Sequence, residues 1–236
     1  MSGVAFFDFD GTVLVKESTR LCAIPSVRGG FVRPLLAVRI AIAMAAYKLK
    51  LLPRTTLHRI CFECYRGRSL AQMEPIIEVM QRGVIRRWFS QPMLDALAGH
   101  RARGHEVVLA TASARSFATP TARDLGIDHV LATELEFDGD VSTGRVAFVL
   151  DGNHKRDACL AFAAARGVGP DDCWFYTDHI ADLPLLEVVG HPVCVGPHGP
   201  LRAIAAARGW PIVEHKRAPA WTPQLSAPSA TSLSTM

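Results

Sequence analysis

The chain has 236 residues, of which 49% are hydrophobic and 20% charged, an ordinary globular balance that excludes disorder throughout. This length allows one sizeable domain, or one domain with an insertion. Residues 14–91 hold 14 Lys or Arg and 4 Asp or Glu, hence +10, whereas the rest holds 12 and 18, hence −6. We therefore expect two parts with different roles.

The chain begins with a pattern typical of a short buried strand. Residues 3–9 (GVAFFDF) are apolar and aromatic, and Asp10-Gly11 ends the run. From about residue 18 to residue 90 the pattern becomes helical. Three helical segments are clear within that region: 34–52, which opens with Pro34 and stops before Pro53, then 52–67 and 69–89.

After Pro92 helices alternate with strands. Helices are expected at 93–104, 115–126, 155–167, 181–190 and 201–209. Strands are expected at 105–110, 129–133, 173–177, 192–196 and 210–213. The segment 134–146 predicts a hairpin with its turn at Asp138-Gly139. Such alternation indicates right-handed crossovers and a parallel sheet with helices on both faces.

The predicted fold class is therefore α/β, a three-layer parallel-sheet core with an inserted helical cap. We assign residues 1–13 and 92–215 to the core and residues 14–91 to the cap. Residues 216–236 are rich in Pro, Ser, Thr and Ala, which predicts a disordered tail.

Polar residues are expected at the carboxyl ends of several strands. They are Asp8 and Asp10 after the first strand, Thr111 after the second, Asp178 after the strand 173–177, Asp182 one helical turn later, and Lys155 at the start of the helix before that strand. Ligands of open parallel sheets bind outside these ends. We therefore expect the acids, the hydroxyl and the lysine to meet at one rim.

These residue types indicate phosphoryl transfer. Several carboxylates share a site only when a cation neutralises them, and oxygen ligands favour Mg²⁺ over zinc. Mg²⁺ and Lys155 would offset the charge of a phosphoryl group while one carboxylate attacks phosphorus. The hydroxyl of Thr111 and nearby backbone N–H groups, here that of Ala112, would hold the other phosphoryl oxygens. The second carboxylate would protonate the leaving oxygen and then deprotonate a water.

The motifs also carry a family resemblance. DFDGT, a strand ending in Thr111, Lys155 and the D-x-x-x-D pair Asp178 and Asp182 resemble the haloacid dehalogenase (HAD) superfamily, over roughly residues 4–213. The order and spacing are most similar to its phosphoserine-phosphatase-like branch, subfamily IB. The resemblance implies a Rossmann-like core with a cap after the first motif. It also implies a Mg²⁺-dependent phosphomonoesterase acting on a small phosphorylated metabolite.

The resemblance implies a role for each motif residue. Asp8 would be the nucleophile that forms an aspartyl-phosphate, and Asp10 the general acid and then the base. Mg²⁺ would be held by Asp8, the backbone carbonyl of Asp10, and Asp178. The remaining implied roles are phosphoryl binding by Thr111 and Lys155, and support of Lys155 and the metal site by Asp182.

Two further residues are candidates for substrate contact. Glu17 lies nine residues after Asp8, where the resemblance implies a glutamate that meets the amine of phosphoserine. The alternative is a residue that begins the first cap helix, since Ser18 and Thr19 follow it. In sequences of the family that this chain resembles, a small residue usually stands beside the aspartate that matches Asp178. Here it is His179, which either touches substrate or faces solvent near the rim.

The basic cap leaves two interpretations open for residues 34–52. They form a core helix of the cap, or they lie on an anionic bilayer, aided by the +10 segment. The second interpretation suits a lipid phosphate such as phosphatidylglycerophosphate. Phosphotransfer to an alcohol is a rival within enzymes. Nucleic acid is not an expected partner, because the acidic rim repels phosphate chains. The oligomeric state is not readable from the sequence.

Cysteine usage and the amino terminus bear on location. The six cysteines are scattered without a framework spacing, which predicts reduced thiols. Asp8 and Asp10 come before any long apolar stretch, so no secretory signal is expected. We expect a cytoplasmic protein, peripheral at the inner membrane face if the cap binds lipid.

Overall fold

A seven-stranded sheet organises the part of the chain that the structure, a computed structural model, describes, residues 3–219. The strand order is β4-β3-β2-β1-β5-β6-β7, and β3 with β4 is the antiparallel pair while the others are parallel. The strands are β1 (Val4–Phe7), β2 (Glu106–Ala114), β3 (His129–Asp138), β4 (Val141–Phe148), β5 (Cys173–Thr177), β6 (His191–Val195) and β7 (Ile212–Val213). The predicted α/β class and the hairpin are confirmed, but the turn lies one residue later than predicted, at Gly139-Asp140, because Asp138 still pairs with Val141.

Helices cover both faces of this sheet. They are α5 (Gln91–Ala102), α6 (Arg115–Asp124), α7 (Gly152–Ala164), α8 (Leu183–Leu186) and α9 (Gly199–Arg208). Successive residues of β1 point to opposite faces, so Phe7 packs in the cluster that includes α5 and α6, and Phe6 in the cluster that includes α7, α8 and α9. A strand buried on both faces explains the unbroken apolar run at the start of the chain.

The six cysteines are free, as predicted.

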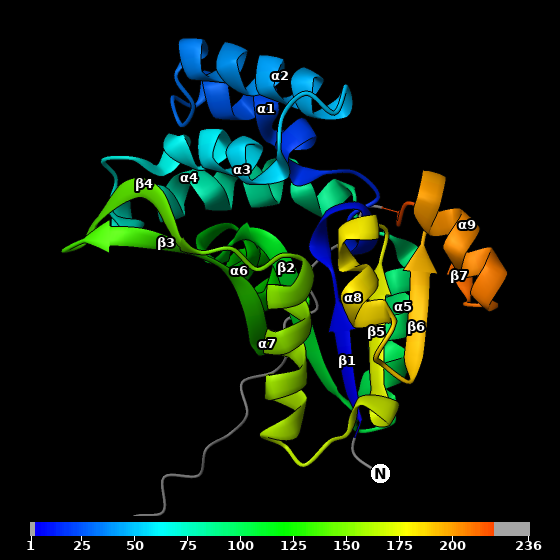
Figure 1. Cartoon of the computed structure of the whole chain (residues 1–236). Helices are drawn as coiled ribbons and strands as arrows, with labels where there is room; N and C mark the ends of the chain where they lie inside the picture. The colour runs from blue at the N-terminus through cyan, green and yellow to red at the C-terminus, as the bar shows by residue number, and fades with distance from the viewer. Residues whose placement is uncertain (1–2, 220–236) are drawn as a thin grey trace, which may run out of the picture.

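Four further helices form a layer above the carboxyl ends of the strands (Figure 1). They are α1 (Ser18–Arg28), α2 (Pro34–Lys48), α3 (Arg54–Phe62) and α4 (Leu70–Gly83). In Figure 1, α1 and α2 are outermost, and α3 and α4 lie between them and the sheet.

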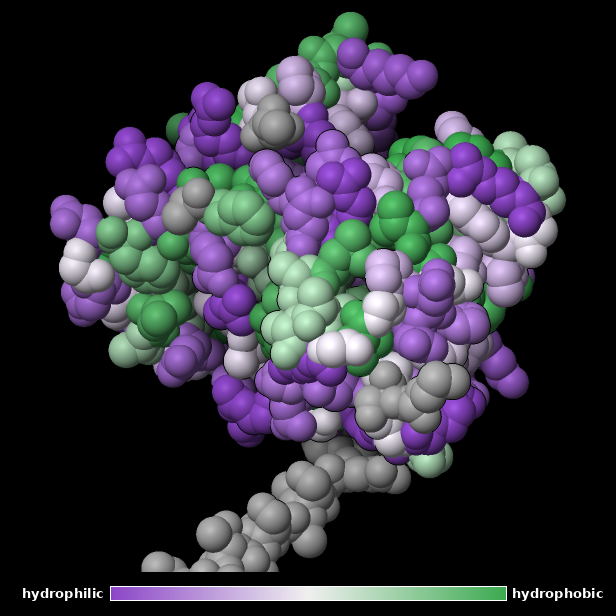
Figure 2. Space-filling model, turned by 60° about the horizontal axis from the view of Figure 1, so that its bottom comes forward, coloured by the Kyte–Doolittle hydropathy of each residue, from purple (hydrophilic) through white to green (hydrophobic). Residues whose placement is uncertain are grey.

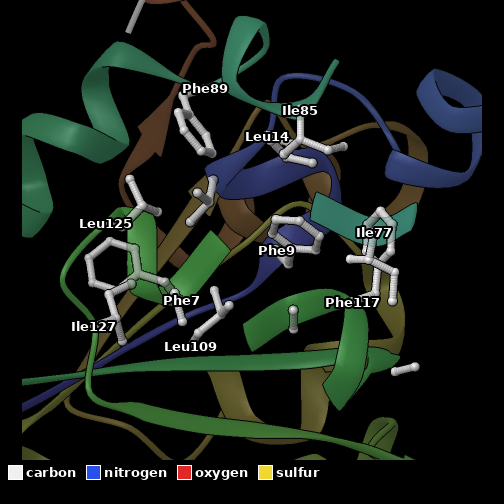
Figure 3. Close-up of a cluster of buried hydrophobic side chains, with 14 of the residues drawn as sticks. Phe7, Phe9, Leu14, Ile77, Ile85, Phe89, Leu109, Phe117, Leu125 and Ile127 are labelled. Carbon is white, nitrogen blue, oxygen red and sulfur yellow. The ribbon is translucent and has the colours of Figure 1, made fainter. Parts of the chain in front are cut away.

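The apolar core is continuous between the sheet and this helical layer. Ile77 of α4 lies beside Phe9 and Phe117 in Figure 3, and the centroids of the two phenylalanine rings are 6.3 Å apart. The edge strand β4 also binds the layer, because Gly67 N donates to Ser142 O at 2.8 Å. The division at residues 14–91 stays a prediction, and both contacts would limit the freedom of such a cap to move away.

Several element boundaries differ from the expectations, and three of the differences are as follows. Helix α2 ends at Lys48, before the predicted residue 52, because Lys50 adopts a left-handed φ of +59° that no helix continues through. The segment 69–89 is not one helix, since α4 ends at Gly83 and a separate 3-10 turn follows. Strand β2 runs past Thr111 to Ala114, with a shift in its pairing to β3.

The predicted disordered tail, 216–236, is wrong for its first residues. Gln91 N donates to Lys216 O at 2.7 Å, and Ala218 N donates to Phe89 O at 2.8 Å. These backbone bonds fix the chain against the segment that returns from the helical layer to α5. The rest of the predicted tail, residues 220–236, lies outside the described residues.

A buried histidine predicts how stability depends on pH. His100 is fully buried, and its ring nitrogens lie 2.9 Å from the Tyr176 hydroxyl and from His105 Nδ1. Burial, together with the charge of Arg103 and the neighbouring His105 and His191, lowers the pKa of His100 from 6.5 to about 4. The unfolded chain therefore binds this proton first as the pH falls.

As the pH falls from 6.5 to about 4, the shifted pKa of His100 should lower the free energy of unfolding. The expected loss is about 3 kcal/mol. Denaturant titrations across this range would measure it. His100→Gln keeps a donor and an acceptor but cannot titrate, so its profile should lack this component. Equal slopes for the wild type and His100→Gln would contradict the assignment.

Candidate active site

The first motif forms a tight turn directly after β1. Asp8 N donates to Tyr176 O at 2.9 Å, which continues the pairing of β1 with β5 for one more residue. The chain then turns through residues 9–13, and Gly11 takes a left-handed φ of +71°. His215 Nε2 donates to Gly11 O at 2.9 Å and holds this turn from the far end of the chain.

A buried ion-pair triad lies at this end of the sheet. Lys155 Nζ is 2.9 Å from Asp8 Oδ1 and 2.9 Å from Asp182 Oδ2. Thr177 Oγ1 donates to the same Asp182 oxygen at 2.6 Å. The lysine side chain is only 3% exposed, and it comes from the first turn of α7. The predicted meeting of Lys155, Asp8 and Asp182 is therefore present.

Burial and mutual repulsion dominate the electrostatics of these groups. Burial raises the pKa of Asp8 to about 7, with Lys155 opposing the shift and Asp182 and Asp10 adding to it. Burial alone would lower the pKa of Lys155, but Asp182 and Asp8 more than compensate, so this pKa is raised and the amine stays charged.

Asp10 occupies a separate hydrogen-bonded position. Ser113 Oγ donates to Asp10 Oδ2 at 2.8 Å, and the backbone N–H of Ser18 donates to Asp10 Oδ1. Burial raises the pKa of Asp10, although these hydrogen bonds and Lys155 lower it in part. Asp10 thus joins the start of α1 to the end of β2, and it is held apart from the triad.

Asp178 lies against the glycine of the first motif. A Cβ atom at Gly11 would come 2.2 Å from Asp178 Oδ2, so this approach requires glycine. Burial raises the pKa of Asp178 well above its ordinary value, and Asp8, Asp182 and Asp10 raise it further. Lys155 is the one buried cation among these four carboxylates within the described residues, so negative charge is in excess.

This excess provides the test for a metal ion. In residues 3–219 no three His, Cys, Asp or Glu side chains are arranged to hold a metal by themselves. The predicted set needs only two carboxylates, those of Asp8 and Asp178, and completes the site with the backbone carbonyl of Asp10. Oxygen donors with surplus negative charge suit Mg²⁺. The residues present therefore fit the ion.

Thr111 and Ala112 lie on β2 next to β1, but their hydrogen bonds go elsewhere. Thr111 is buried, and its Oγ1 accepts from Ser113 N at 3.0 Å. Ala112 O accepts from Thr133 Oγ1 at 2.7 Å. Their contact with a phosphoryl group stays a prediction.

Glu17 and His179 have different surroundings. Glu17 is exposed directly before α1, and its backbone carbonyl accepts from Leu21 N at 3.1 Å. His179 does not simply face solvent, because its Nδ1 lies 2.9 Å from an Arg54 nitrogen and accepts from Ala181 N at 3.1 Å. Burial and the charge of Arg54 lower the pKa of His179.

Arg54 is a rim residue that the sequence reasoning missed. It is the first residue of α3, and its Nε lies 3.1 Å from Asp151 Oδ2, while another nitrogen meets His179. Asp151 Oδ1 is buried with no partner among the described residues. Arg54 thus ties the helical layer to the loops before α7 and after β5. The partners are about 100 residues or more away in sequence, so local spacing contains no signal for them.

Comparison with known proteins identifies this arrangement. The family model for haloacid dehalogenase-like hydrolases matches residues 5–187. The chain belongs to this family. A probable phosphatase of Mycobacterium tuberculosis is 32% identical over 238 residues, which cover 98% of this chain and 82% of the relative. The predicted HAD hydrolase is confirmed.

Two solved structures agree with the HAD fold. A protein of unknown function from Bordetella pertussis superposes with a TM-score of 0.82 at 29% identity, covering 90% of this chain and 99% of that one. A phosphoserine phosphatase in the form of a phospho-aspartyl intermediate analogue superposes with a TM-score of 0.66 at 16% identity, covering 92% and 94%. At that identity the second likeness concerns the fold alone.

A glycine pair tests the contact between Gly11 and Asp178 in this HAD hydrolase. Gly11→Ala should displace Asp178 and lower hydrolysis by about 10²-fold or more, because a Cβ at 2.2 Å forces the carboxylate away. Gly30 has the same φ of +71° with no atom within 4 Å. Gly30→Ala should therefore cost only the backbone strain, about 1 kcal/mol, and leave hydrolysis unchanged. Steady-state kinetics and thermal unfolding of both variants would measure this, and equal activities would contradict it.

Proposed function

We propose that the chain is a phosphatase that hydrolyses a small phosphomonoester through covalent phosphorylation of Asp8. The observation that carries this proposal is the pairing of Asp8 with buried Lys155 at 2.9 Å, beside a second acid that is held apart. One carboxylate placed to attack and another placed to move protons is the division of labour that such a reaction needs.

The proposed reaction assigns a role to each of these residues. Asp8 Oδ attacks phosphorus and forms an acyl-phosphate, while Asp10 in its protonated form gives its proton to the leaving oxygen. Asp10 then accepts a proton from a water that attacks the same phosphorus, which releases phosphate and restores Asp8. Lys155 and the hydroxyl of Thr111, with the N–H of Ala112, would hold the phosphoryl oxygens.

A magnesium ion completes the proposed site. The carboxylates of Asp8 and Asp178 and the backbone carbonyl of Asp10 would hold it. Mg²⁺ would supply positive charge against the phosphoryl oxygens and the surplus of carboxylates. Asp182 holds Lys155 through its 2.9 Å contact, so the amine is already in position before the substrate binds.

We propose a small phosphorylated metabolite, of the phosphoserine type, as the substrate class. Glu17 adjoins Ser18, whose N–H binds Asp10, and its carboxylate would meet the amine of such a substrate. His179, held by Arg54, adds a second polar group at the rim. A panel of amino-acid, sugar, histidinol and lipid phosphates would find the substrate.

Removal of metal tests the proposal independently of the substrate. With a generic aryl phosphate, we expect a chelator to abolish hydrolysis and added Mg²⁺ to restore it. Ca²⁺ should restore less, because its longer and more variable coordination suits the two carboxylates and the carbonyl poorly. Full activity in the presence of chelator would contradict the metal assignment.

A further inference from the structure

Helix α2 packs Leu36, Ala37 and Ile40 against the apolar core and exposes a second apolar stripe on its other side. Leu35, Val38 and Ile42 of α2 and Leu49 directly after it are 75%, 55%, 64% and 70% exposed, and their spacings of three, four and seven residues place them on one side. In contrast, Ala43 is the one residue of α2 that is buried. The helix therefore presents part of its apolar surface to the outside.

The surrounding surface extends this stripe. Ile24 of α1 and Leu51 after α2 are 65% and 75% exposed. Together with the four residues named above, they make six of the eleven large hydrophobic residues that are exposed within the described chain. Figure 1 shows α1 and α2 at the outer edge of the molecule, with no element above them. On the lower face, which Figure 2 brings forward, hydrophobic patches lie between hydrophilic side chains. We call these six residues together the apolar stripe: Ile24, Leu35, Val38, Ile42, Leu49 and Leu51.

Unpaired positive charge surrounds the apolar stripe. Residues 18–62 contain eight Lys or Arg and no Asp or Glu. Arg28 and Arg33 lie near the start of α2, and Lys48 and Lys50 at its end, all exposed. Within residues 3–219 none of these four has a salt bridge to an acid, whereas Arg39 is paired with Glu63 at 2.8 Å. Such a surface needs a partner that supplies negative charge.

A basic hollow lies beside the stripe. It has a volume of about 660 Å³ between the end of α2 and the start of α3. Lys48, Lys50 and Arg54 contribute to its lining, and no acid does. Arg54 also reaches the rim of the active site through Asp151 and His179. The hollow therefore suits an anionic headgroup next to an apolar surface.

We propose that the apolar stripe and its basic surround dock on an anionic lipid surface. Apolar side chains would enter the boundary between headgroups and acyl chains, while the lysines and arginines contact lipid phosphates. A second copy of the chain suits this surface poorly, because it would bring two sets of unpaired positive charges together. No helix within residues 3–219 is long and apolar enough to cross a membrane, so the contact is peripheral. This proposal goes beyond the hydrolytic function and does not rest on it.

Co-sedimentation with vesicles tests the docking. The full chain should bind vesicles of phosphatidylcholine with phosphatidylglycerol and not vesicles of phosphatidylcholine alone, and high salt should weaken the binding. Ile42→Glu should reduce the binding about tenfold or more, because it places a charge in the stripe. Val79→Glu is the matched control, since Val79 is 72% exposed on α4 and lies outside the stripe. Lys50→Glu should weaken binding, whereas Arg103→Glu, on α5's carboxyl end, should not.

Several outcomes would overturn the proposal. They are equal binding to both vesicle types, no binding to either, or binding that Ile42→Glu leaves unchanged. A dimer in solution that Ile42→Glu dissociates, without vesicle binding, would assign the stripe to a second copy instead. Hydrolysis of a soluble aryl phosphate should be equal in Ile42→Glu and Val79→Glu, which separates this test from a failure of the proposed function. Thermal unfolding confirms that each variant is folded.

Discussion

Replacing Asp8 with Asn is expected to lower phosphate hydrolysis by at least about 10⁴-fold. The amide keeps the shape of the side chain and one oxygen for Lys155, but it cannot attack phosphorus to form an acyl-phosphate. Because burial raises the pKa of Asp8 to about 7, the charged carboxylate is costly in the folded protein. Asp8→Asn should therefore be as stable as the wild type at neutral pH, or more so.

Kinetics with a generic aryl phosphate and thermal unfolding together would measure this. Asp157→Asn is a suitable control, because Asp157 is an exposed carboxylate on α7 whose partner in the described part of the chain is Arg156. It should keep full activity. Activity of Asp8→Asn within tenfold of the wild type would show that another group attacks phosphorus.

Replacing Lys155 with Met should damage both activity and stability. The lysine contacts Asp8 and Asp182 at 2.9 Å each, and its removal leaves buried carboxylates without a cation. We expect a loss of about 3–5 kcal/mol in the free energy of unfolding at neutral pH. Hydrolysis should fall by about 10²–10³-fold or more, because a positive charge aimed at the phosphoryl oxygens is lost.

The stability loss in Lys155→Met should depend on pH. Lys155 lowers the pKa of Asp8 in part, so without it burial and the neighbouring Asp182 and Asp10 would hold this pKa further above that of the unfolded chain, and the folded variant would bind a proton more readily. Its deficit against the wild type should then shrink as the pH falls below neutral. Lys50→Met, at an exposed lysine that forms no salt bridge within residues 3–219, should show neither effect. An equal deficit at all pH values would contradict the triad.

The acidic part of the site could be predicted from the sequence, because short apolar runs show where buried strands end. Apolar runs that stop at Asp8 and shortly before Asp178 place both acids at one edge of a parallel sheet. The contacts that complete the site are not local. His215 binds Gly11 across 204 positions, and Arg54 meets His179 across 125. No periodicity or motif indicates such pairs, since they depend on how the helical layer and the last strand pack.

Residues 34–52 also depend on contacts that local sequence patterns do not predict. Their composition favoured a helix, and the helix is present as Pro34–Lys48. Composition alone did not distinguish a core helix from one that lies on a membrane, because a helix that is apolar nearly all round has little sidedness. The structure shows how the helix is rotated, since Leu35 and Ile42 are exposed and Ala43 is buried, while contact of the exposed side with a membrane stays a proposal. Packing against α1 and α3, which no local pattern encodes, sets that rotation.

The covalent intermediate on Asp8 is the central claim, and rapid quenching in acid tests it most directly. The enzyme would be mixed with Mg²⁺ and an aryl phosphate, stopped within one turnover, digested, and analysed by mass spectrometry. We predict one added phosphoryl group on the peptide that contains Asp8, and none in Asp8→Asn. Burst release of the aryl alcohol with no phosphorylated peptide, or a phosphoryl group on another residue, would contradict the account.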